Sequence, residues 1–230
     1  MRKIISLAVW ILIIPALALT GYWLYDDQQY EVISLLIALL ACLPFFIHFE
    51  KRKPDPREMV LVAVFIAIGV VSRIAFATVP GFKPVAAMTI LVGIAFGPEM
   101  GFMVGALTAV LSNLYFGQGP WTPYQMFAWG IIGFGAGMIF KKENARKIWF
   151  IIPYGIIAGI GYSMILDIWT VFTVDNAFAL TRYLFFVAGS LPTMIIYVAS
   201  NVAFLLVLAN PILSKLERIK KKYGIFELQV

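Results

Sequence analysis

The chain has 230 residues, of which 62% are hydrophobic and 15% aromatic, while only 13% are charged. An average soluble domain has about 25% charged residues, so this composition excludes an ordinary soluble enzyme, a disordered tail and a coiled coil. It predicts an all-α fold, a polytopic bundle of transmembrane helices.

A spanning helix needs about 20 predominantly apolar residues, and the chain offers eight candidate segments. The first could instead be a signal peptide, because a basic start precedes it and Ala16-Leu17-Ala18 could be cleaved. Its apolar run is longer than that of a typical signal peptide, which favours an uncleaved anchor. The segments are residues 4–25, 32–49, 59–79, 85–96, 100–116, 123–140, 148 to about 167 and about 184–209.

The basic residues set the expected orientation, because cytoplasmic loops of membrane proteins are rich in Lys and Arg. With the N-terminus in the cytoplasm, 15 of the 18 basic residues fall on the cytoplasmic side. The net charge of +6 therefore reflects the orientation of the chain in the membrane. We expect a multi-pass protein of the cell membrane with both termini cytoplasmic. The 15 are Arg2, Lys3, Lys51, Arg52, Lys53, Arg57, Lys141, Lys142, Arg146, Lys147, Lys215, Arg218, Lys220, Lys221 and Lys222.

The polar stretch 50–58, which contains two prolines, is the clearest boundary in the chain. Pro56-Arg57-Glu58 is typical of a helix start, with proline and an acidic residue in the first turn. We therefore predict an accessory transmembrane hairpin over 1–49, a cytoplasmic linker over 50–58, a six-helix core over 59–214 and a basic cytoplasmic tail over 215–230. The single cysteine, Cys42, excludes an intrachain disulfide and a Cys-based metal site, and is expected to be a small buried or lipid-facing residue.

Polar and aromatic side chains gather in three connections on the expected outer side, at 79–84, 113–125 and 167–183. Small-molecule pockets combine apolar walls with a few convergent polar groups, although Trp and Tyr also form interfacial belts and Pro-Gly stretches are turns. Gln125 and Trp129 are four residues apart and lie on one helix face. For one cluster of these residues, ligand binding is the favoured interpretation, because two amides near a membrane boundary need hydrogen-bond partners. The cluster consists of Asn113, Gln118, Trp121, Tyr124 and Gln125.

Arg73 is an intramembrane charge, about fifteen residues into its segment and so roughly 20 Å along the helix. Such residues are costly and functional by default. It can snorkel outward, contact an anionic ligand group, or pair with an acid. Asp167, near the outer end of its own segment, is the expected partner.

Small residues repeat at four-residue spacing on three segments. Gly101 with Gly105, and Gly133 with Gly137, predict helices that approach closely. Ala63 and Ala67 form a similar pair, which could pack internally or accept a partner helix. The sequence contains no ATP-binding motif and no close pair of carboxylates, so we expect neither ATP hydrolysis nor acid–base catalysis by this chain.

The core, over about 57–224, resembles the substrate-binding S components of energy-coupling factor (ECF) vitamin transporters. The resemblance rests on Ala63-xxx-Ala67, Phe82-Lys83-Pro84, the glycine-rich stretch 93–105 and, most specifically, residues 112–129. Residues 112–129 and the ending 215–224 are similar to the group assigned to cobalamin. The N-terminal hairpin lies outside the pattern of the family.

The resemblance implies that this subunit captures a vitamin at the extracellular face and needs no cofactor of its own. A membrane scaffold subunit and two cytoplasmic ATPases complete the transporter, and ATP hydrolysis by those partners drives toppling of the S component. Ala63 and Ala67 are then expected to dock on the scaffold. The expected ligand-binding residues are Phe82, Lys83, Asn113, Tyr115, Gln118, Trp121, Tyr124, Gln125, Trp129, Asp167, Trp169 and Arg182.

Other interpretations remain open from sequence. The ligand could be a queuosine precursor, a pyrimidine or another small vitamin, which would need a closed pocket, whereas cobalamin needs a wide mouth. The volume under the loop 116–122 discriminates between them. An intramembrane enzyme would need a convergent catalytic set, and an assembly factor would tolerate changes at Trp121, Tyr124 and Gln125.

Overall fold

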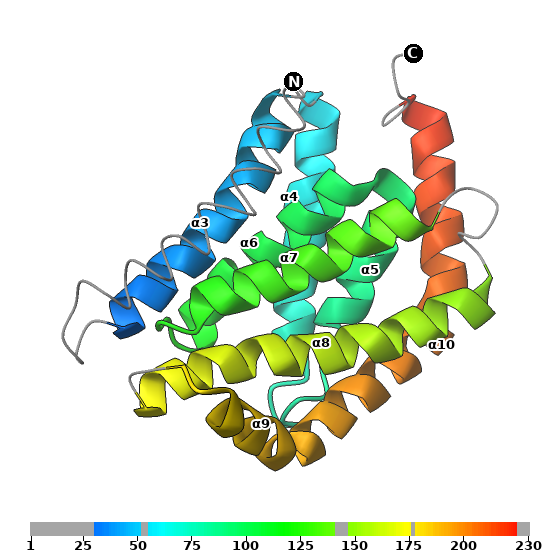
Figure 1. Cartoon of the computed structure of the whole chain (residues 1–230). Coiled ribbons are helices and arrows are strands. Elements are labelled where there is room, and N and C mark those ends of the chain that lie inside the picture. The colour runs from blue at the N-terminus through cyan, green and yellow to red at the C-terminus, as the bar shows by residue number, and fades with distance from the viewer. Residues whose placement is uncertain (1–29, 52–54, 141–146, 176–177, 225–230) are drawn as a thin grey trace.

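The computed structural model describes residues 30–51, 55–140, 147–175 and 178–224. Within these ranges the chain is all helical, which confirms the predicted fold class; the segment predicted over 4–25 lies outside them. Figure 1 shows the arrangement of the helices. They are α3 (Tyr30–Lys51), α4 (Pro56–Ala75), α5 (Val85–Phe96), α6 (Pro98–Phe116), α7 (Thr122–Ile139), α8 (Ile148–Asp175), α9 (Leu180–Gly189) and α10 (Leu191–Tyr223).

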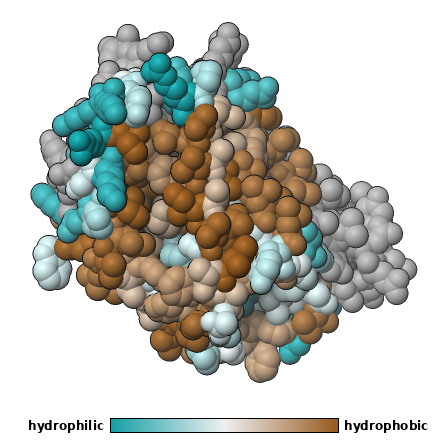
Figure 2. All heavy atoms as spheres, turned by 180° about the vertical axis from the view of Figure 1, so that it is seen from behind, coloured by the Kyte–Doolittle hydropathy of each residue, from teal (hydrophilic) through white to brown (hydrophobic). Residues whose placement is uncertain are grey.

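The length and composition of the helices are those of a multi-pass membrane protein. Four of the described helices, α4, α6, α8 and α10, are long and apolar enough to cross a membrane, and α5 and α9 are shorter apolar helices. The face shown in Figure 2 is hydrophobic over most of its area, with hydrophilic residues at its upper left, toward the C-terminal end of α10. Such a surface suits contact with lipid.

Local sequence signals fix several helix starts. The Asp55 side chain accepts a hydrogen bond of 2.7 Å from the backbone N–H of Arg57, and Pro56 occupies the first turn of α4. The start predicted at Pro56 is therefore confirmed. Gly97, with a φ of 99°, joins α5 to α6 in a conformation that favours glycine, and Pro98 then begins α6.

Glycines bring α5, α6 and α7 together at backbone distance, as expected from their spacing. A methyl group added to Gly93 or Gly101 would overlap the backbone carbonyl of Gly133, and one added to Gly105 would overlap that of Trp129. Where no side chain separates two helices, their backbones can approach closely and make van der Waals contact. This contact forms a dense half of the bundle, centred on α6 and α7 (Figure 1).

The last predicted segment differs from the structure in two ways. It is divided at Ser190 into α9 and α10, because Gly189 ends one helix and Pro192 stands in the first turn of the next. At its other end α10 continues to Tyr223 rather than stopping near Ala209. Leu213 and Leu216 are buried against the core, so the helix persists through residues 215–223, where the sequence suggested a tail.

Helix α3, the described half of the predicted N-terminal hairpin, packs on α6 and α7. The rings of Phe45 and Phe102 are stacked with centroids 3.9 Å apart, and Phe45 meets Phe134 edge-on. Cys42 is buried in the same cluster as Phe102, which confirms it as a small buried residue. Phe49 is buried in a second cluster, with residues of α4. The added helix is thus joined to the core by aromatic packing.

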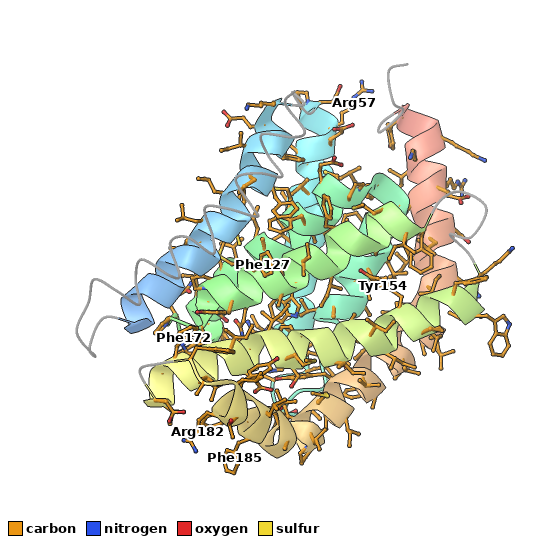
Figure 3. The ribbon with its side chains drawn as sticks, viewed as in Figure 1. Arg57, Phe127, Tyr154, Phe172, Arg182 and Phe185 are labelled. Carbon is orange, nitrogen blue, oxygen red and sulfur yellow. The ribbon has the colours of Figure 1, made fainter. Side chains whose placement is uncertain are left out.

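The two ends of the bundle differ in charge. The start of α4, with Arg57, lies at the upper end in Figure 3, and the basic end of α10 lies on the same side in Figure 1. Arg182 and Phe185, on α9, project from the opposite end (Figure 3). Arg182 pairs there with Asp175 at 2.7 Å.

Candidate functional site

A cavity of about 100 Å³ lies between the C-terminal part of α4, the loop 76–84, the start of α5, and α7, α8 and α10. It is at the other end of α4 from Arg57. Its walls combine aromatic rings, amides and two cations. The lining residues are Arg73, Gly81, Lys83, Val85, Ala86, Gln125, Trp129, Gly159, Tyr162, Tyr197 and Asn201.

Arg73 is the most polar group of the cavity wall, and its side chain is only 7% exposed. Its Nη1 donates hydrogen bonds to the hydroxyl of Ser112 and, at 2.7 Å, to Oδ1 of Asn113. Its Nε is buried and has no hydrogen-bond partner within the described part of the chain. A guanidinium with neutral acceptors and a free donor is prepared to bind another acceptor.

Asn113 connects this arginine to the rest of the wall. The side chain of Asn113 is fully buried, and its Nδ2 donates to the Thr122 hydroxyl at 2.9 Å and to Oε1 of Gln125 at 2.8 Å. Nε2 of Gln125 donates in turn to the hydroxyl of Tyr162 at 3.3 Å. The polar network therefore ties α4, α6, α7 and α8 together and fixes which way each amide points.

Aromatic rings form the remaining wall. Trp129 stacks on Tyr162 with centroids 5.4 Å apart and planes 10° from parallel, and Tyr197 meets Tyr162 edge-on at 4.9 Å. The Arg73 guanidinium lies 5.1 Å from the centroid of Trp129. These rings give a rigid, polarisable surface suited to a planar ligand.

Lys83 comes from the loop 76–84, which closes one side of the cavity. The Ser200 hydroxyl donates to the backbone carbonyl of Lys83 at 2.9 Å, and neighbouring Phe82 packs against Phe76 and Phe204. Burial and, secondarily, the positive charge of Arg73 lower the pKa of the Lys83 amine. The loop thus brings a second, partly buried cation to the same site.

The expected ion pair between Arg73 and Asp167 is wrong. Arg73 bonds to Ser112 and Asn113 of α6, whereas Asp167 accepts a hydrogen bond of 2.7 Å from the Ser190 hydroxyl. The reason is the helix order in space: α4 packs on α5 and α6, while α8 packs on α7, α9 and α10.

The remaining predicted ligand-binding residues lie around the cavity or away from it. Tyr115 is 65% exposed, and Gln118, also exposed, donates to the backbone carbonyl of Val110 at 2.7 Å. Trp121 and Trp169 meet edge-on at 5.6 Å, and Tyr124 is buried. Of the twelve residues named from sequence, the structure brings Lys83, Gln125 and Trp129 into the lining.

Sequence reasoning missed Tyr162, Tyr197 and Asn201. Asn201 is a polar side chain inside an apolar segment, which is the signal that could have identified it, whereas Tyr162 and Tyr197 look like ordinary aromatic residues of such segments. Asn201 donates from Nδ2 to the backbone carbonyl of Gly155 at 3.0 Å, so it also holds α10 to α8. The described residues include no group of His, Cys, Asp and Glu that could hold a metal ion.

The predicted docking alanines lie on the opposite face of α4 from the cavity. Ala63 and Ala67 are exposed, with Val60, Val64 and Val71 exposed beside them. The buried face of the same helix holds the residues that meet the core: Val62, Phe65, Ile66, Gly69 and Arg73.

Comparison with known proteins gives one family. A family model described as "ECF-type riboflavin transporter, S component" matches residues 55–218, which cover α4 to most of α10 and leave α3 outside. No curated protein matches the chain, and no solved structure matches it.

Proposed function

Because the chain belongs to the family of ECF-type riboflavin transporter S components, it is a substrate-binding subunit of a membrane importer, and we propose that the cavity beside Arg73 is its ligand site. The cavity is lined by Arg73, in the last turn of α4, and by Asn201, in the first half of α10, so it lies away from the basic ends at Arg57 of α4 and at Lys220–Lys222 of α10. With those ends in the cytoplasm, as the positive-inside rule favours, it opens toward the outside of the cell membrane and both termini are cytoplasmic.

One observation supports this site above the others. Arg73 is a buried, membrane-level cation at a cavity wall, and its described contacts are all with neutral groups. Charged residues at this depth are rarely kept for structure alone. The larger hollow of about 480 Å³ at the end of α10 is lined, among the residues that the structure describes, by that helix alone, and none of them forms an opposing wall for a ligand.

The size of the cavity favours a compact, planar vitamin. Pockets that bury drug-sized ligands have volumes of roughly 300–1,000 Å³, so even a small vitamin must widen a cavity of about 100 Å³. A flavin ring needs far less widening than the corrin ring and nucleotide of cobalamin. The family name also points to riboflavin, and we place the flavins, riboflavin and its 5′-phosphate, ahead of the cobalamin suggested by residues 112–129.

Capture is tested by titrating the purified chain, without ATP or partner subunits, with a panel of vitamins that includes riboflavin and cobalamin. Calorimetry should give saturable binding of one compact member, with riboflavin first in order. Binding of cobalamin alone would overturn the ligand assignment, and no heat with any member would overturn the ligand site.

Delivery then requires docking on a scaffold subunit powered by two ATPase subunits. The exposed face of α4 around Ala63 and Ala67 supports this role, because small residues let a partner helix approach closely. Changing both alanines to leucine should abolish co-purification with the scaffold and leave ligand binding intact. Ala199→Leu, at an exposed alanine of α10, is the matched control, and normal co-purification of the double variant would contradict docking through α4.

A further inference from the structure

We propose that the ligand captured by this chain presents an acidic group, a carboxylate or a phosphate, to Arg73 and Lys83. The inference rests on the proposed function, because it names the chemistry of the ligand for the same cavity. Riboflavin is neutral and its 5′-phosphate carries such a group, so both flavins can enter the cavity and the phosphate form is expected to bind more tightly.

The first support is the hydrogen-bonding state of Arg73. Its acceptors are a hydroxyl and an amide, both neutral, and its Nε is buried without a partner. Burying a guanidinium without an anion is costly, since desolvation is compensated only by neutral dipoles. A carboxylate or phosphate in the cavity that Arg73 lines would neutralise this charge and supply the charged acceptor that the guanidinium lacks.

The second support is the position of the two cations relative to one ring. The Arg73 guanidinium lies 4.4 Å and the Lys83 ammonium 4.6 Å from the centroid of Phe116. Two positive charges gathered at one partly buried ring repel each other, and this repulsion adds to burial in lowering the pKa of Lys83. An anion beside both would turn the repulsion into attraction.

The third support is that the protein does not supply the anion itself. Of the cavity-lining residues in the described ranges, none is acidic. Asp167, on the neighbouring stretch of α8, is engaged by the Ser190 hydroxyl, and Asp175 pairs with Arg182. The tyrosines Tyr162 and Tyr197 face the cations from α8 and α10, and phenols are neutral at physiological pH.

The contacts of Asn113 make it a positioning residue for this chemistry. It accepts from Arg73 and donates to Gln125, so it fixes the guanidinium at the cavity wall without lining the cavity. The aromatic part of the ligand would then face Trp129 and the tyrosines, with its acidic group toward α4 and the loop 76–84.

The test compares matched pairs of probes that differ in one acidic group. Nicotinate and nicotinamide are almost the same size and differ by a carboxylate, while riboflavin 5′-phosphate and riboflavin differ by a phosphate. Equilibrium dialysis with the purified full chain should show the acidic member of at least one pair binding about tenfold tighter or more, as expected for one charge-assisted hydrogen bond. A preference for nicotinate over nicotinamide would indicate a carboxylate, and a preference for riboflavin 5′-phosphate over riboflavin would indicate a phosphate.

Substitutions at Arg73 and Lys83 test whether these two cations cause the preference for the acidic member of a pair. Arg73→Gln should abolish the discrimination, Arg73→Lys should keep part of it, and Lys83→Gln, in a loop, should reduce it with little risk to folding. Arg57→Gln, at the exposed far end of the same helix, is the matched control and should keep the full preference.

The outcomes separate this inference from the proposed function. Equal binding of both members of each pair, unchanged by Arg73→Gln and Lys83→Gln, would overturn the inference and leave the ligand site standing. Absence of binding by these probes and by the whole vitamin panel would overturn both.

Discussion

The two halves of the bundle pack their helices in opposite ways. Where α5, α6 and α7 meet near Gly93, Gly101 and Gly133, side chains are absent and the backbones touch. Around Arg73 the helices are held apart by long polar and aromatic side chains, and a cavity remains. The glycine contact therefore makes one half of the bundle rigid, whereas the half around Arg73 provides the cavity and the charge for a ligand.

Gly133→Ala should produce the largest loss of stability. The added methyl group would meet the backbone carbonyl of Gly101, which cannot rotate away, so we expect destabilisation of about 3 kcal/mol. Gly161→Ala on α8 meets nothing within 4 Å and should be neutral or stabilising by up to about 1 kcal/mol. Thermal unfolding in detergent measures both, and equal melting temperatures would refute the division of the bundle into these two halves.

Asn113→Ala should have the next largest effect, because it removes one residue that serves several partners. Arg73, Thr122 and Gln125 would each lose a buried hydrogen bond, which costs about 2 kcal/mol in stability and loosens Arg73. Unlike Gly133→Ala, this change should also weaken ligand binding by about tenfold or more. Asn210→Ala, on the exposed face of α10, is the control; undiminished binding by Asn113→Ala would show that the network does not position the site.

Tyr115→Ala should have the smallest effect. The side chain is 65% exposed and packs edge-on against Phe116, outside the cavity lining. We expect a change below about 0.5 kcal/mol in stability and less than about twofold in ligand affinity. A tenfold loss would place Tyr115 in the site, as its sequence position first suggested.

The close contact of α6 and α7 and the start of α4 could be predicted from sequence, because glycine spacing and proline at helix starts act locally. The four-residue glycine pairs on α6 and α7 and the start at Pro56 are examples. The cavity was harder to predict, since it depends on which helices are neighbours. The sequence identifies Arg73 as an intramembrane charge but predicts the wrong partner, because it does not show that α4 lies against α6 and apart from Asp167.

Two further limits of the sequence have physical causes. Tyr162 and Tyr197 resemble ordinary aromatic residues of apolar segments until the crossing of α8 and α10 brings them together. Arg182, by contrast, stood out as a charge but is satisfied by Asp175 on the surface. A polar residue therefore becomes a site residue only when its neighbours leave part of it unsatisfied.

The most direct test of the ligand site compares the affinity of the purified chain for riboflavin with and without the Trp129 side chain. Trp129 lines the cavity, whereas Trp149, at the far end of α8, is 85% exposed, so Trp149→Ala is a matched control. The account predicts saturable binding without ATP that Trp129→Ala weakens about tenfold or more and Trp149→Ala leaves unchanged. Equal affinity of both variants and the unaltered chain would contradict it.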